Sequence, residues 1–320
     1  MFPLLEEAGA CPVCASSDLR PLHVYAAKKR AIAASSNLAM IGCAGCGVVF
    51  SHPLPSERQL EDYYAAGYWD ERLPRVAPGR EEKLARHTAQ LELLSPHLSL
   101  PDRPDGHPPR AFDYGCGRGE WLDVLADAGW ETSGLEPGAP ARAFAAQRHT
   151  VVDELPADGA YDLVVLNHVL EHLRDPLGVL RRVVAATRPG GYVFVSVPDL
   201  GRLPEHGRFS YVKSGVHIMS YTFSAMRSLM SLAGLEVVGR FDGPEWDAVL
   251  PPEAGRLKCL GRRTDGVASI EGHPLDEAVE SLLAYGREAE RETSVDAAAG
   301  RPAGGGRGAA RRLLGRLAGR

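Results

Sequence analysis

The sequence predicts an α/β fold with a doubly wound, mostly parallel sheet of seven strands. From residue 110 onward, short apolar runs alternate with helix-like segments, which is the pattern of parallel strands joined by crossover helices. The runs are continuous, as in residues 161–166, and lack the polar alternation of a half-exposed strand. Both faces of the sheet are therefore expected to be covered. Two cysteine pairs ahead of this region predict a small N-terminal metal-binding subdomain.

The two cysteine pairs have the spacing C-x₂-C, Cys11 with Cys14 and Cys43 with Cys46, and lie within residues 1–55. Four thiolates match the tetrahedral preference of zinc, and each pair falls on a tight turn. One zinc ion would tie together two short hairpins that have no core of their own, so we expect a closed structural site. Two pairs of buried cysteines without a metal are the alternative. A redox pair is disfavoured because no βαβ pattern surrounds either motif.

Residues 56–109 are expected to form a helical segment and a linker. Ser56 is a suitable N-cap for an amphipathic helix over residues 57–66, and a second helix is expected over residues 80–94. The proline-rich stretch 96–109 predicts the linker. Four aromatic residues at and after the end of the first helix either pack the metal subdomain against the main domain or form a wall of a substrate pocket: Tyr63, Tyr64, Tyr68 and Trp69.

The main domain is expected over residues 110–263. Its seven strands are expected at residues 110–114, 131–135, 149–152, 161–166, 191–197, 235–239 and 256–261. Its helices are expected near residues 118–128, 139–147, 176–187 and 224–233. Pro189, Gly190 and Gly191 predict a turn that leads into the fifth strand.

The C-terminal part is expected to divide into a helix and a tail. Residues 264–293 hold one amphipathic helix, predicted over residues 275–291. Residues 294–320 are rich in Gly, Ala and Arg and cannot bury enough apolar area to offset the entropy of ordering, so we expect a disordered basic tail. For residues 309–317 the alternative is a short basic amphipathic helix in weak contact with an anionic surface.

The composition bounds the class of protein. The 320 residues are 44% hydrophobic and 24% charged, as in ordinary globular proteins. The net charge is −5, and six arginines without an acidic residue lie in residues 297–320, so the rest of the chain is more acidic still, which argues against nucleic acid as a partner. No apolar run is long enough to span a bilayer, and no signal peptide is recognisable at the start. Six cysteines without a secretory signal favour a reducing compartment, so we expect a cytoplasmic protein.

A glycine-rich segment, residues 111–119, predicts the ligand site. Asp113 ends an apolar run, and Gly115, Gly117 and Gly119 follow at every second position before a helix. Such glycines let the backbone turn tightly and approach a ligand where a strand meets a helix. The next apolar run ends in Glu136, whose carboxylate can accept hydrogen bonds from two ribose hydroxyls. The dinucleotide pattern G-x-G-x-x-G places its third glycine elsewhere, and an acid before the loop suits a cationic ligand better than a pyrophosphate.

These residues resemble the class I Rossmann-like methyltransferases that use S-adenosylmethionine (SAM). The resemblance implies that the loop lies along the methionine and ribose portion of SAM, with cofactor-binding positions at Tyr114, Gly115, Cys116, Gly117 and Gly119. It also implies that Asp113 faces the methionine amino group and that Glu136 holds the ribose hydroxyls.

Three further positions follow from the same resemblance. Asp153, after the third strand, would bind the adenine amino group, or else be a solvated loop acid. Asn167 and His168 close the fourth strand, beside the reactive methyl group in this fold.

Two histidines are the candidates for the catalytic base. An unperturbed histidine can take a proton near neutral pH. His172 lies in Glu171–Leu173, a run that recurs in this family with different substrates, so a scaffold role is its alternative. His217 lies in a loop expected over the carboxyl ends of the strands, where His217 or Tyr221 would touch the substrate.

The order of the N-terminal motifs is similar to that of a bacterial subgroup of these methyltransferases, which carry an N-terminal zinc knuckle. This resemblance spans roughly residues 11–263 and implies a small-molecule or glycan acceptor. A run like Glu-His-Val, which marks the deoxysugar C-methyltransferases, is not found, and this disfavours a nucleotide-sugar acceptor. An NAD-dependent oxidoreductase is disfavoured by the glycine spacing. A non-catalytic adaptor with a zinc knuckle and a nucleotide-binding domain is the alternative function.

Overall fold

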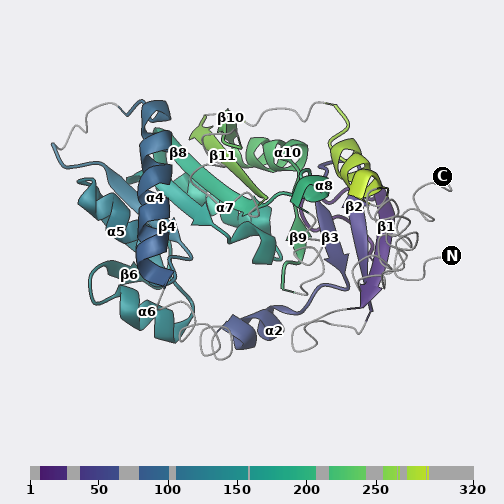
Figure 1. Cartoon of the computed structure of the whole chain (residues 1–320), viewed down its shortest axis with the longest axis horizontal. Helices are drawn as coiled ribbons and strands as arrows, with labels where there is room; N and C mark the ends of the chain where they lie inside the picture. Colours follow the sequence, from purple (N-terminus) through teal and green to yellow (C-terminus); the bar gives the residue numbers. More distant parts are fainter. Residues whose placement is uncertain are drawn as a thin grey trace, which may run out of the picture.

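The fold is given by a computed structural model (Figure 1). It describes residues 8–26, 37–64, 79–100, 106–157, 159–206, 216–242, 255–264, 266, 272–285 and 287. Tyr68, Trp69 and the predicted basic tail, residues 294–320, lie outside the described residues.

The main sheet has seven strands in the order β10-β11-β8-β7-β4-β5-β6. Their bounds are β4 (Arg110–Tyr114), β5 (Glu131–Leu135), β6 (Thr150–Val152), β7 (Tyr161–Asn167), β8 (Thr187–Pro198), β10 (Leu235–Arg240) and β11 (Arg256–Arg263). All neighbouring strands are parallel except β11, which is antiparallel to both β8 and β10. The predicted mostly parallel sheet is confirmed. Because β5 and β7 lie on opposite sides of β4, the strand order reverses there, and open α/β sheets bind ligands outside the carboxyl ends of the strands at such a point.

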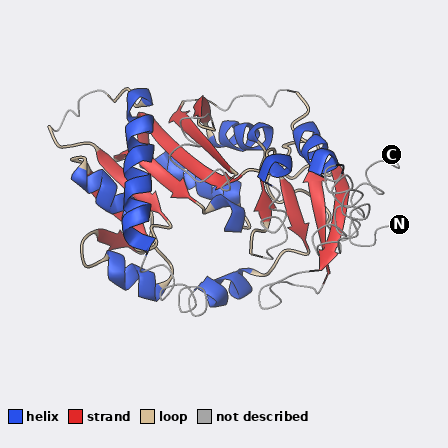
Figure 2. Ribbon diagram, viewed as in Figure 1, coloured by secondary structure: helices blue, strands red, loops and turns tan. Residues whose placement is uncertain are grey.

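Helices cover both faces of this sheet (Figure 2). One face packs against α4 (Arg80–Leu94) and α5 (Glu120–Asp127), and the other against α7 (Pro176–Ala186) and α10 (Phe223–Ala233). Leu163 and Val165 of β7 point to the first face, while Val164 and Leu166 point to the second. Continuous apolar runs are therefore needed, because alternate residues of one strand enter different cores.

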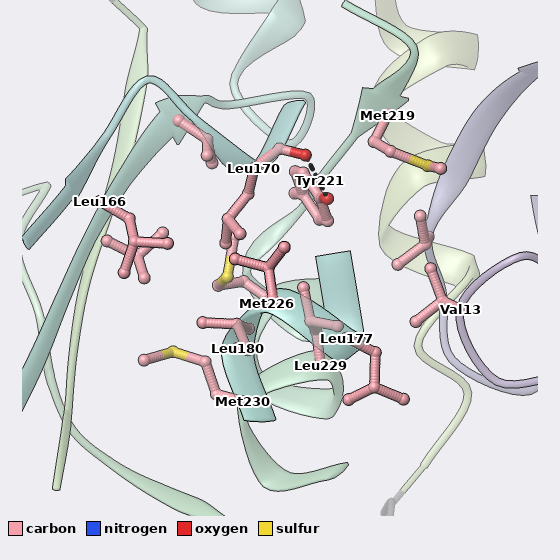
Figure 3. Packing of buried hydrophobic residues seen from close by; sticks show 14 of the residues in the cluster. Val13, Leu166, Leu170, Leu177, Leu180, Met219, Tyr221, Met226, Leu229 and Met230 are labelled. Atoms are coloured by element: carbon pink, nitrogen blue, oxygen red, sulfur yellow. Dashed lines mark hydrogen bonds between the residues drawn. The ribbon is translucent and has the colours of Figure 1, made fainter. Parts of the chain in front are cut away.

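The second core, around α7 and α10, is mostly apolar. Figure 3 shows Leu177 and Leu180 of α7 close to Met226, Leu229 and Met230 of α10. Burying each such side chain contributes roughly 1.5–3 kcal/mol. The remaining helices are α2 (Glu57–Asp62), α6 (Ala139–Ala145) and α8 (Leu203–His206), with 3₁₀ turns η3 (Ser95–His97) and η4 (Leu170–His172).

A second, antiparallel sheet joins the N-terminal region to the main domain. Its order is β1-β2-β3-β9, with β1 (Leu19–Ala26), β2 (Asn37–Cys43), β3 (Val49–His52) and β9 (Met219–Ser220). Val49 pairs with Ser220 and Phe50 with Met219, although β9 lies far along the chain. The sequence pattern did not predict β9. Its two residues are too few for a periodic signal.

A helix over residues 276–285 covers the outer side of the second sheet. Leu275, Ala278 and Leu282 pack against Leu22 and Met40 in one buried cluster. Ser281 Oγ donates to Leu200 O at 2.6 Å, which fixes the helix to the segment after β8. The predicted helix over residues 275–291 is therefore present as far as the chain is described.

Two predicted elements differ in detail. The turn predicted at Pro189–Gly191 is instead part of β8, which runs from Thr187 to Pro198. Thr187 pairs with Tyr161 and Tyr192 with Leu163, so the intervening residues of β8 bulge out of the ladder and the strand continues past them. The α-helical part of α2 ends at Asp62, residues 63–64 continue as a π turn, and residues 65–66 of the predicted helix lie outside the described residues. Its predicted N-cap is present: Ser56 Oγ accepts from Gln59 N in a capping box.

Within the described ranges, no helix combines the length and apolar character needed to cross a membrane.

Candidate functional site

The loop between β4 and α5 is built from left-handed glycines. The φ angles of Gly115, Gly117 and Gly119 are +81°, +55° and +82°. Side chains are disfavoured in this region, so the alternating glycine spacing has a direct backbone cause. At Gly115 a Cβ would also lie 2.8 Å from Cγ2 of Val169. The loop thus passes close to the turn after β7, and both stand at the carboxyl edge of the sheet.

Backbone hydrogen bonds and Glu136 hold this loop in place. Gly115 N and Cys116 N both donate to Leu135 O, at 2.8 and 2.9 Å. The Glu136 carboxylate accepts from Gly117 N at 2.9 Å through Oε2 and from Gly138 N at 2.7 Å through Oε1. Glu136, predicted only as a ribose ligand, therefore also supports the glycine loop.

Asp113 is a buried carboxyl in an acidic surrounding. Its side chain is 3% exposed, and among the described residues Oδ1 has no hydrogen-bond partner. Burial, reinforced by Glu136 and Glu120, raises the pKa of Asp113 well above its ordinary value. A cationic group beside Asp113 would relieve this cost, so the site fits a ligand with an ammonium group, as the methionine portion of SAM has.

The other predicted cofactor residues differ in their burial. Tyr114 is half-buried at the end of β4, and the buried Cys116 packs against Leu122 and Ala145. Burial raises the pKa of the Cys116 thiol, so it stays protonated. Asp153 is an exposed acid after β6, paired with Arg142 at 2.5 Å.

The end of β7 carries Asn167 and His168. His168 adopts φ +59°, and its N donates to Ser196 O at 2.8 Å. Its Nδ1 lies 3.0 Å from Oε1 of Glu171. A left-handed non-glycine residue is uncommon and often found at functional sites. The turn η4 follows directly and brings Glu171 and His172 to the same edge as the glycine loop.

His172 and His217, the two candidates for the catalytic base, lie next to each other. Their ring centroids are 4.8 Å apart at 75°, and Tyr64 approaches His172 edge-on at 5.8 Å. Nδ1 of His172 lies 3.1 Å from Val216 O, and since a carbonyl only accepts, this nitrogen carries the proton. Burial lowers the pKa of His172 to about 4. The ring is therefore neutral near pH 7, with a lone pair on Nε2.

The segment before and after β9 is fixed to η4. Ile218 N donates to Glu171 O at 2.8 Å, and the Tyr221 hydroxyl donates to Leu170 O at 3.0 Å (Figure 3). Tyr221 is fully buried, and burial raises the pKa of its phenol well above the ordinary value. Tyr221 therefore anchors this edge by a hydrogen bond inside the core.

The four N-terminal cysteines converge. Cys11 and Cys46 sulfurs are 3.7 Å apart, Cys14 and Cys43 sulfurs 3.5 Å, and all four lie within 4.8 Å of one another. Zinc–sulfur bonds of about 2.3 Å would put tetrahedral sulfurs about 3.8 Å apart. Hydrogen bonds to Cys11 and Cys46 lower the pKa of the Cys43 thiol, and hydrogen bonds to Cys11 and Cys43 raise the pKa of the Cys46 thiol. The set fits zinc.

The two cysteine turns have the same backbone design. Ala15 N donates to Cys11 O, and Gly47 N donates to Cys43 O, at 3.0 and 2.8 Å. Ala15 and Gly47, each directly after its second cysteine, have φ of +59° and +77°. Two equivalent turns facing one point are what a shared metal requires.

Comparisons with known proteins show which family the chain resembles. A family model described as "Methyltransferase domain" matches residues 64–239. The chain is 32% identical over 118 residues to a ubiquinone biosynthesis O-methyltransferase of Marinobacter nauticus, which covers 32% of this chain and 49% of the relative. The corresponding protein of Vibrio parahaemolyticus is 35% identical over 100 residues, covering 27% and 43%. The chain thus spans about half the length of the curated relatives it matches.

Among solved structures, the 1,6-didemethyltoxoflavin-N1-methyltransferase of Burkholderia thailandensis, with its substrate and S-adenosylhomocysteine bound, is 20% identical to this chain. The match covers 75% of this chain and 100% of that one, with a TM-score of 0.47.

Proposed function

This chain belongs to the methyltransferase-domain family, and we propose on that basis that it transfers the methyl group of SAM to an oxygen atom of a small-molecule acceptor. The oxygen is suggested by the curated relatives, whose names describe O-methyltransferases. The single observation that carries the cofactor assignment is the buried carboxylate of Asp113. It lies with Glu136 beside a loop of three left-handed glycines and has an unpartnered oxygen among the described residues.

The residues of the glycine loop would hold the cofactor. Asp113 Oδ1 is available to accept hydrogen bonds from the methionine ammonium. Each oxygen of Glu136 already accepts one backbone amide, yet a carboxylate oxygen has a second lone pair for a ribose hydroxyl. Asn167 and His168 stand beside the glycine loop at the end of β7, and Asp153 would contribute at the more exposed edge. SAM itself supplies a methyl group that its sulfonium already activates.

The chain's remaining task is to align the acceptor and help it lose a proton. Alignment alone can lower a barrier by roughly 7–11 kcal/mol. The residues that we propose for this task are His172 and His217, which lie next to each other. Near neutral pH, Nε2 of His172 carries a lone pair, and Oε1 of the buried Glu171 lies 3.8 Å from this nitrogen. Such a group can take a proton or bind a cation beside the acceptor oxygen.

The proposed cofactor is tested by calorimetry with SAM and with S-adenosylhomocysteine. Wild-type protein should bind both at micromolar levels. Asp113→Asn keeps the shape of the side chain but removes its charge, and should weaken SAM by at least tenfold because the ammonium loses its counter-charge. Absence of binding heat with the wild type would refute the assignment. A screen that offers phenols and glycans separately then identifies the acceptor class.

We further propose that the four cysteines hold one structural zinc ion. The sulfur spacing and the two equivalent turns support it. Four protein ligands close the coordination shell, so this ion would stabilise the fold and take no part in the transfer. Such a thiolate site suits the reducing cytoplasm, which is our proposed location.

A further inference from the structure

A second group of metal-ligand side chains lies at the proposed acceptor site. Glu171, His172 and His217 each offer one ligand atom, and these atoms all lie within 4.8 Å of one another. Two of them come from the turn η4 and the third from the segment before β9. No thiol belongs to this group, which separates it chemically from the cysteine cluster.

Glu171 is the buried carboxylate of this group. Its side chain is 1% exposed, and among the described residues Oε2 has no hydrogen-bond partner. Its other oxygen, Oε1, lies 3.0 Å from His168 Nδ1 and 3.8 Å from His172 Nε2. Burying a carboxylate is costly unless a cation or several donors compensate it.

His172 is oriented as metal-bound histidines are. Its Nδ1–H donates to the Val216 carbonyl, so Nε2 carries the lone pair, and this atom lies 3.8 Å from Oε1 of Glu171. A backbone carbonyl on the far ring nitrogen is a usual outer contact of a ligating histidine and fixes its tautomer. The His217 ring stands at 75° to that of His172, with centroids 4.8 Å apart.

The two segments that supply these side chains are locked together. Ile218 N donates to Glu171 O at 2.8 Å, and Ser51 N donates to Ile218 O at 2.9 Å. The segment carrying His217 is therefore bonded to η4 on one side and to β3 on the other. Its geometry is set by the fold before any ligand arrives.

We propose that Glu171, His172 and His217 bind a divalent transition-metal ion, a second site besides the cysteine cluster. Two imidazoles and one carboxylate suit Mn²⁺, Fe²⁺, Co²⁺ or Zn²⁺. Three protein ligands leave coordination positions open, and, resting on the proposed function, one of these takes the acceptor hydroxyl. The hydroxyl proton then passes to solvent water, the oxygen lone pair forms the bond to the methyl carbon, and the carbon–sulfur bond breaks with its electrons left on sulfur.

The test is a Mn²⁺ titration of the full chain, purified with its zinc, followed by electron paramagnetic resonance. Mn²⁺ favours oxygen and nitrogen ligands over thiolates, so it reports the second site. One Mn²⁺ per chain is expected, with affinity lowered at least tenfold in Glu171→Gln and in His217→Gln. Glu205→Gln, an exposed acid paired with Arg202, is the matched control and should bind as the wild type does.

Calorimetry with SAM on the same proteins separates this proposal from the proposed function. If Mn²⁺ fails to bind, or binds Glu171→Gln and His217→Gln as tightly as the wild type, the metal site is refuted even though SAM binds. If SAM fails to bind while Mn²⁺ binds with the expected pattern, the metal site stands and the methyltransferase proposal falls. Two variants are used so that one unfolded protein does not decide the result.

Discussion

At the scale of single residues, Glu136 supports the glycine loop in addition to its proposed task as a ribose ligand. Its carboxylate accepts the amides of Gly117 and Gly138, so Glu136→Ala would leave two donors without their partner. We expect a loss of about 1–3 kcal/mol in the free energy of unfolding, together with weaker SAM binding. Chemical denaturation measures the first and calorimetry the second.

The control for this variant is Glu131→Ala. Glu131 is an exposed acid at the start of the same strand, paired with Arg110. Its removal should change stability by less than about 1 kcal/mol. Equal stability of Glu136→Ala and Glu131→Ala would show that the loop does not depend on Glu136.

Asp199, buried at the end of β8, gives the fold a pH dependence. Burial raises the pKa of Asp199 to about 6, with Glu277 and Asp242 adding to the effect while Gly201 N and Arg240 oppose it. Because the folded state holds this proton more tightly than the unfolded state, stability falls as pH rises from about 4 to about 6. Above pH 6 the loss is complete.

Asp199→Asn should therefore be more stable than the wild type at pH 7, by up to about 3 kcal/mol, and equal to it near pH 4. The amide oxygen can still accept from Gly201 N, so the local hydrogen bond is kept. Denaturant unfolding at several pH values measures the difference. A gap between the two proteins that does not grow between pH 4 and pH 6 would contradict this assignment.

At the scale of elements, the glycine loop can be tested by comparing two glycines. Gly115 and Gly129 have nearly equal φ angles, +81° and +87°, but only Gly115 has a neighbour in the way, Val169. Gly129→Ala should cost only the backbone strain, roughly 1–2 kcal/mol, and leave SAM binding unchanged. Gly115→Ala should lower the free energy of unfolding by more than this and should also weaken SAM binding. Thermal unfolding measures the first effect and calorimetry the second. Equal effects would mean that the close approach to Val169 has no role.

The cysteine turns should control a segment distant in the sequence. Removing the proposed zinc ion with a chelator, or replacing Cys43 by Ser, should loosen β3 and with it β9 and residues 216–221, because the ladder joins them. Hydrogen exchange of these amides should increase, while the amides of β4 and β5 keep their protection. Metal analysis should give one zinc per chain before chelation if the Mn²⁺ site is empty as purified. Unchanged hydrogen exchange in residues 216–221 would show that the proposed metal ion does not stabilise this edge of the fold.

The elements that the sequence predicted well are those bounded by clear turn residues. Strand β5 and helix α4 have the predicted bounds, because glycine or proline residues lie on both sides of each. A turn was predicted at residues 189–191, but these residues form a bulge within β8, and Pro and Gly occur in turns and bulges alike. Asp113 and the four cysteines could be found from spacing. The contact of Glu136 with the loop and the meeting of His172 with His217 depend on tertiary packing, which spacing does not encode.

At the scale of the whole molecule, the four-stranded sheet combines three N-terminal strands with β9, which comes from between two strands of the seven-stranded sheet in the sequence. The predicted division at residue 55 remains a prediction, and β9 shows that residues on both sides of it build one sheet. The helix over residues 276–285 also contacts both, through Leu22 of β1 and through Leu200 after β8. The N-terminal region is thus hydrogen-bonded to the segment around β9, next to His217 and the other candidate acceptor residues.

The pairing of β3 with β9 also bears on biosynthesis. A ribosome releases the N-terminal end of a chain first, so residues 11–52 are available long before residues 219 and 220. All four cysteines are in that early segment and can capture an ion while synthesis continues. Until β9 emerges, β3 has an open edge, and such edges invite pairing with other chains. Nascent chains that stop before residue 219 should therefore aggregate more readily than chains that include β9.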